Sequence, residues 1–140
     1  MPPTTRIRKA ATQTALRRAR SPAAEGDARA QSVLGLLYYH GHGVPQDEAE
    51  AMKWFRNAAN RGDARAQYQL GLFYANGYAG ETDNVSAHMW FNLAAVRFPA
   101  SDISYRSAAS RNRDLVAERM THDEIAEAQK LAREWKPKSN

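Results

Sequence analysis

The six residues Gly26–Gln31 read Gly-Asp-Ala-Arg-Ala-Gln, and the same six return at Gly62–Gln67, a displacement of 36 positions. The match continues without a gap through the residues that follow. Its clearest pairs are Leu34 with Leu70, Gly35 with Gly71, Tyr38 with Tyr74, Trp54 with Trp90, and Phe55 with Phe91. Repeats of about 20 to 50 residues are typical of solenoids, in which each unit buries its apolar face against its neighbours.

Apolar residues in each repeat follow helical spacing in two stretches. In the first repeat, Leu34 and Tyr38 lie one helical turn apart, and Trp54 and Phe55 precede two alanines. Such spacing lines one face of an amphipathic helix, and glycine beside that face lets another helix approach closely. The predicted core consists of Leu34, Gly35, Tyr38, Trp54, Phe55, Leu70, Gly71, Tyr74, Trp90 and Phe91.

Glycine and aspartate separate the predicted helices. Gly62 suits the left-handed backbone that ends a helix, and Asp63 can accept the free amides that begin the next one. Gly26 and Asp27 repeat this arrangement. The sequence therefore predicts an all-α fold, a short α-solenoid of about three stacked helix-turn-helix hairpins.

A chain of 140 residues is long enough for one domain with a core. The helical repeat domain is predicted at residues 25–135, with repeats at about 25–60, 61–99 and 100–135, followed by a tail at 136–140. The third repeat is expected to be divergent, because the repeat pattern fades after Pro99. Residues 1–24 precede this domain as a basic arm, which we expect to be loosely ordered and solvated.

The basic residues are concentrated in that arm. Its cations are Arg6, Arg8, Lys9, Arg17, Arg18 and Arg20, and it contains no acidic residue. Apart from these six, fourteen basic residues face fifteen acidic ones, so the net charge of +5 does not describe the repeat domain. Nucleic-acid contact is therefore expected only as non-specific binding by the arm.

Two composition features restrict the function classes. The chain has no cysteine, which excludes disulfides, thiolate metal sites and a cysteine nucleophile. No stretch approaches the roughly 20 apolar residues of a membrane span, and the N-terminus lacks the apolar segment of a secretory signal. A cytoplasmic location is favoured, and an organellar transit peptide is the alternative, because the arm combines arginine with serine and threonine.

These motifs resemble the Sel1-like repeat family, a tetratricopeptide-like class of α-solenoid. The resemblance rests on Leu34-Gly35 followed by Tyr38, on Gly41-x-Gly43-Val44, and on the closing alanines of both repeats. The second repeat departs from the family pattern in the loop at 77–82. The resemblance implies that the first helix of each hairpin lines a concave binding face.

Carried onto this chain, the concave face comprises positions outside the core stripe. The predicted partner-binding residues are Arg29, Ser32, Leu36, Tyr39, Arg65, Tyr68, Leu72 and Ala75. Tyrosine and arginine often dominate protein interfaces. Two alternatives remain open: that the arginines solvate their helices or pair with nearby acids, and that the leucines belong to the core between repeats.

Catalytic chemistry has little support in the sequence. His40 and His42 could share a metal, but no further ligand completes a site. We therefore expect no catalytic residue, no bound metal and no cofactor. The predicted function is a non-enzymatic protein–protein interaction scaffold or adaptor that binds a peptide or protein subunit on the concave face. The alternative is a structural accessory subunit of a larger complex, tethered by its basic N-terminal arm.

Overall fold

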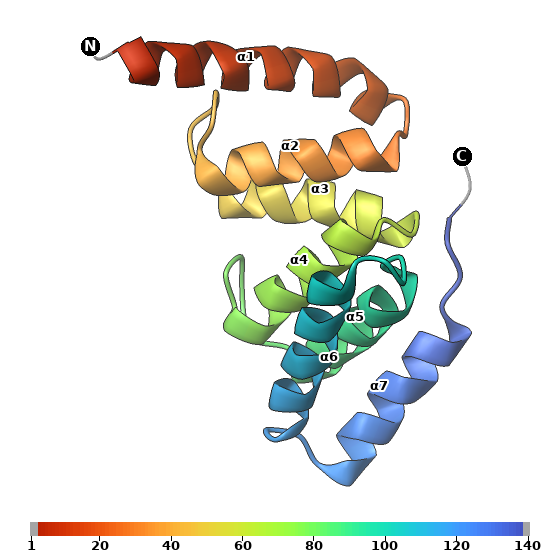
Figure 1. Ribbon diagram of the computed structural model, residues 1–140. Helices are drawn as coiled ribbons and strands as arrows, with labels where there is room; N and C mark the ends of the chain where they lie inside the picture. Colours follow the sequence, from red (N-terminus) through yellow and green to blue (C-terminus); the bar gives the residue numbers. More distant parts are fainter. Residues whose placement is uncertain (1–2, 139–140) are drawn as a thin grey trace.

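The computed structural model describes residues 3–138, which fold into seven helices without a strand. They are α1 (Pro3–Ala24), α2 (Ala28–His40), α3 (Glu48–Asn60), α4 (Ala64–Asn76), α5 (Asn84–Arg97), α6 (Ile103–Ala117) and α7 (His122–Glu134). Figure 1 shows them stacked as helix pairs from the N-terminal to the C-terminal end. The predicted all-α repeat fold is confirmed.

The two repeats form matching hairpins. Helix α2 packs on α3, α4 packs on α5, and α3 joins the hairpins by packing on α4. Aspartates cap the helices in the same way: Asp27 and Asp63 each accept the backbone N–H three residues ahead at 2.9 Å. Gly26 and Gly62 turn the chain between helices with φ of 96° and 97°. Repeated local signals therefore produce repeated geometry.

Aromatic rings and glycines fit together inside each hairpin. Phe55 and Phe91 are buried, and each ring lies against the glycine of its partner helix, Gly35 or Gly71. The structure also buries Leu34, Leu70 and Trp90. Three members of the predicted core are only partly buried, namely Tyr38, Trp54 and Tyr74.

The N-terminal arm differs from the sequence-based expectation, because the structure has a helix where a loosely ordered segment was predicted. Leu16, Ala19 and Ala23 are buried against α2. The Asp27 N–H donates to the Pro22 carbonyl, as the Asp63 N–H donates to the Ala58 carbonyl. Helix α1 thus contacts α2 as α3 contacts α4, and burial of its small apolar face accounts for its order.

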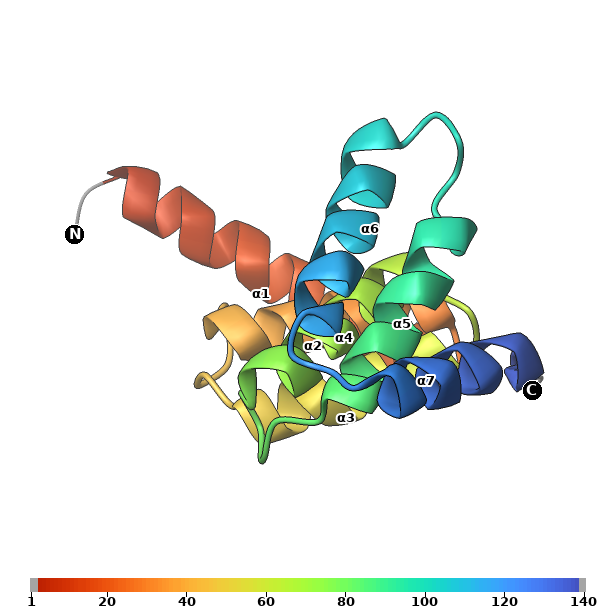
Figure 2. The same cartoon turned by 90° about the horizontal axis from the view of Figure 1, so that it is seen from below.

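The third unit is divergent, as predicted. Helices α6 and α7 both pack extensively on α5, and they lie on different sides of it (Figure 2). Thr121 and Glu124 form the expected capping box at the start of α7. Beyond α7, the Trp135 ring lies 6.3 Å from that of Trp90, and the Lys138 N–H donates to the Asn60 carbonyl at 2.7 Å. This tail contact brings the end of the described chain back to the α3–α4 turn.

His88 on α5 gives the fold a predicted pH dependence. The side chain is 4% exposed, and burial, then the positive charge of Arg113, lower its pKa below the ordinary 6.5, while Asp114 opposes the shift. The unfolded chain therefore binds more protons than the folded chain below about pH 6.5. The contribution of neutral His88 to the free energy of unfolding is fully present above that pH and is lost as the pH drops toward the lowered pKa.

We expect the free energy of unfolding to fall as the pH drops below 6.5, and His88→Gln to flatten this dependence. Chemical unfolding followed by circular dichroism at several pH values measures both. His122→Gln, at an exposed histidine, is the matched control and should keep the wild-type slope. An unchanged slope in His88→Gln would remove this histidine as the cause.

Candidate protein-binding groove

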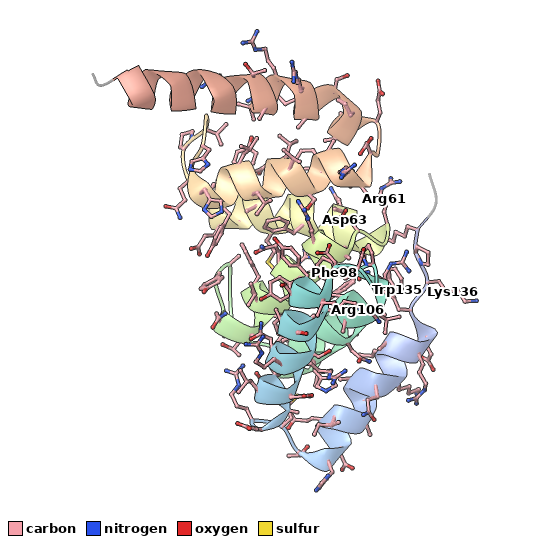
Figure 3. The ribbon with its side chains drawn as sticks, in the orientation of Figure 1. Arg61, Asp63, Phe98, Arg106, Trp135 and Lys136 are labelled. Atoms are coloured by element: carbon pink, nitrogen blue, oxygen red, sulfur yellow. The ribbon has the colours of Figure 1, made fainter. Side chains whose placement is uncertain are left out.

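A cavity of about 370 Å³ opens where α2 faces the start of α4 and the link between α5 and α6. We call it the α2–α4 groove. Ser32, Val33 and Leu36 line it from α2, and Phe98 and Pro99 line it from the end of α5. Phe98 and Asp63 are labelled in Figure 3, where they lie between α2 and the first turn of α6. Half of the residues that line the groove are thus apolar.

Four charged residues surround these walls. Arg29 and Arg65 are exposed, and Asp63 and Asp102 complete the rim. Asp63 is already engaged as the cap of α4 through the Ala66 N–H. Neither arginine forms an ion pair with a described side chain. The Arg65 guanidinium lies 5.8 Å from the centre of the Tyr105 ring, a cation–π distance.

Ser32 is the unusual residue in the groove wall. Its side chain is buried, and its Oγ has no hydrogen-bond partner among the described residues. The matching position in the second repeat is Tyr68, whose ring lies 5.8 Å from Phe91 and 6.5 Å from Phe98. The Tyr68 hydroxyl accepts a hydrogen bond from Asn112 at 3.0 Å. The Tyr68 ring therefore occupies space beside α4 in the second repeat, whereas the smaller Ser32 side chain leaves the matching space beside α2 open.

Three second-repeat residues of the predicted face, Tyr68, Leu72 and Ala75, are buried or partly buried beside α6. Tyr68 and Leu72 pack on a cluster that contains Ala75 and Val116 of α6. Arg119 reaches the Ala75 carbonyl at 3.4 Å. Because α6 covers this part of α4, Tyr68, Leu72 and Ala75 lie outside the groove, while Arg65 at the start of α4 stays on its rim.

Tyr39, at the other end of α2, also lies outside the groove. Its ring is 5.4 Å from that of Phe73 and 6.0 Å from that of Tyr78, so it belongs to the contact between repeats. Burial first, then Tyr78 and Glu48, raise the pKa of its hydroxyl. The structure therefore brings together four of the eight predicted residues: Arg29, Ser32, Leu36 and Arg65.

Similarity to a known protein family coincides with the two hairpins. The model of the Sel1 repeat family matches residues 28–63 and 64–95, which correspond to the two hairpins. The chain belongs to the Sel1 repeat family. The two matches begin at the first residue of α2 and of α4, and they include the core glycines Gly35 and Gly71.

Two solved structures extend the likeness beyond the matched Sel1 repeats. A protective antigen of uropathogenic Escherichia coli, with an SLR fold, aligns over 88% of this chain with 32% identity and a TM-score of 0.78. A Sel1 repeat protein from Oxalobacter formigenes aligns over 86% with 25% identity and a TM-score of 0.60. The chain spans 25% and 54% of these proteins, respectively. No curated protein matches it in sequence.

The histidine pair of this Sel1 repeat protein lies at the tip of the first hairpin. The His40 and His42 rings stack with their centres 5.3 Å apart. Within the described part of the chain, histidine and carboxylate side chains nowhere form a group of three or more that could hold a metal. None of the helices in residues 3–138 combines the length and apolarity needed to cross a bilayer.

Proposed function

We propose that this Sel1 repeat protein is a non-enzymatic scaffold whose α2–α4 groove binds a peptide or a segment of a protein subunit. The supporting observation is the combination of apolar walls with two rim arginines that form no ion pair with described side chains. The volume of the α2–α4 groove lies within the range of about 300 to 1,000 Å³ that is common for ligand sites. Arginine can grip a carboxylate with two parallel hydrogen bonds.

The same lining argues for binding over catalysis. The titratable carboxyl groups of the groove are Asp63, which caps α4, and Asp102, which precedes α6. No histidine or lysine lines this groove to act with them. A general acid–base pair needs two groups within reach of one substrate atom, so the groove residues favour recognition without chemistry.

The test is a pull-down from native extract with two matched double variants. Arg29→Ala with Arg65→Ala should lower partner affinity by about tenfold or more, because arginine is frequent among the residues that dominate interfaces. The control, Arg17→Ala with Arg20→Ala, removes the same charge from the exposed face of α1 and should keep the partner. Circular dichroism verifies that both variants remain folded.

A second candidate function rests on α1. Its sequence has six cations and no acid, and Arg17, Arg18 and Arg20 are exposed on the ordered helix. These residues favour docking on an acidic surface of a larger complex, with the repeats as the structural mount. The pull-down above separates the candidates: loss only in the α1 variant supports an accessory subunit tethered through α1, and retention by both variants contradicts both candidates.

A further inference from the structure

The geometry points to a specific occupant of the α2–α4 groove: a tyrosine side chain of the partner, with an acidic residue beside it in the partner sequence. This inference rests on the proposed function, because it names what the groove selects. Its basis is the difference between the two repeats at a single position, Ser32 against Tyr68.

The second repeat shows how an aromatic ring occupies this position. The Tyr68 ring packs against Phe91 and Phe98, and its hydroxyl accepts a hydrogen bond from Asn112. In the first repeat, Ser32 lacks the ring, and the cavity opens in front of it. An incoming tyrosine would therefore supply to the first repeat the kind of contact that the second repeat makes within its own chain.

Both the lining residues and the volume of the cavity suit an aromatic side chain. Val33 and Leu36 are half-buried and offer apolar contact, and the Phe98 ring, which is 3% exposed, is held by stacking on Tyr105 at 5.1 Å. A fixed aromatic wall favours offset or edge-on packing of a second ring. Aromatic residues are also frequent anchors in well-packed interface pockets.

Ser32 accounts for the preference for tyrosine over phenylalanine. A buried hydroxyl without a hydrogen bond lowers the stability of the site, and the Ser32 Oγ has no partner among the described residues. Because the Oγ atom is itself buried, pairing with a phenol oxygen requires the Ser32 side chain to turn about χ1 toward the cavity that the residue lines. Phenylalanine fills the same volume but leaves the serine unpaired.

The charged residues on the groove rim indicate which type of residue lies beside the tyrosine in the partner sequence. Arg29 and Arg65 stand on the groove edge without ion pairs to described side chains, so they can receive a carboxylate. Asp63 and Asp102 on the same rim balance this charge and disfavour a long acidic run. The rim therefore suits one acidic residue next to the tyrosine.

The experiment selects a phage-displayed library of random peptides on the full chain. Enriched peptides should share a tyrosine with an aspartate or glutamate within one or two positions. For such a peptide, fluorescence anisotropy should show about tenfold or greater loss of affinity when its tyrosine becomes alanine, and a smaller loss for phenylalanine. In the wild-type protein, the amide NMR signals of Ser32 and Leu36 should shift when the peptide binds.

Ser32→Tyr provides the matching change in the protein, since its own ring would fill the cavity as Tyr68 does. We expect it to lose peptide affinity by about tenfold or more, while Ser107→Tyr, at an exposed serine of α6, keeps it. Should Ser32→Tyr not fold, the wild-type NMR shifts and the peptide substitutions still decide the outcome.

The outcomes separate this inference from the proposed function. Enriched peptides that need Arg29 and Arg65 but contain no tyrosine would overturn the aromatic inference and leave the groove as the binding site. Binding by tyrosine peptides that leaves the Ser32 and Leu36 signals unshifted would also overturn it. Absence of any peptide that distinguishes the wild type from the double arginine variant would contradict both.

Discussion

Replacing Phe91 with alanine should lower the free energy of unfolding by about 3 to 5 kcal/mol, the largest effect that we expect from a single substitution. The ring is 1% exposed and joins three helices, since it contacts Gly71 of α4 and shares a cluster with Val116 of α6. Alanine would remove this burial and leave a cavity. For a small domain this is a large part of the total stability.

Urea unfolding followed by circular dichroism measures this loss. Leu115→Ala is the matched control, because Leu115 is a large apolar residue on α6 that is 53% exposed, and its substitution should cost far less. Equal losses for Phe91→Ala and Leu115→Ala would contradict the assignment of the Phe91 ring to the joint between α4, α5 and α6.

Replacing Gly71 with alanine should also destabilise the fold, by about 1 to 3 kcal/mol, although alanine is the better helix former. A Cβ at this position would lie 2.7 Å from the Cδ1 and Cε1 atoms of Phe91, much closer than carbon atoms pack. The ring is buried, so it cannot move into solvent. The destabilisation by overpacking is therefore expected to exceed the roughly 1 kcal/mol by which alanine favours the helix over glycine.

Gly80→Ala is the control for this substitution, because a Cβ there meets nothing within 4 Å. The double variant Gly71→Ala with Phe91→Leu should be less destabilised than the sum of its single changes, since the smaller side chain relieves the clash. Unfolding midpoints of the wild type, Gly71→Ala, Phe91→Leu and the double variant measure this coupling. A stabilising Gly71→Ala would show that the two helices can separate without cost.

The two central hairpins could be predicted because their signals are local and occur twice. Each cap, turn and apolar stripe is encoded within a few residues, so α2 to α5 follow from the repeat alone. Helix α1 was missed because arginines surround its small apolar face, and only contact with α2 reveals that Leu16, Ala19 and Ala23 are buried. The pattern of α7 indicated a helix, but the choice of α5 as its support depends on tertiary packing.

The groove was predictable only in part, because some of its residues come from segments that only tertiary packing brings together. Helical register places Arg29, Ser32 and Leu36 on one face of α2, so a sequence can indicate that side of the site. Phe98 and Pro99 come from the link after the second repeat, where no periodic pattern applies. Register also could not reveal that α6 covers Tyr68, because the covering residues lie more than forty positions away.

The tail contact has a consequence for the order in which the chain can assemble. Most helix contacts join neighbouring segments, so each hairpin can close during synthesis once its second helix has left the ribosome. The bond from Lys138 to Asn60 closes a far longer loop, and its entropy cost is larger. Because Lys138 follows α7, we expect this bond to form late, after the third unit has been synthesised. In the folded chain it couples the segment after α7 to the junction of the two repeats.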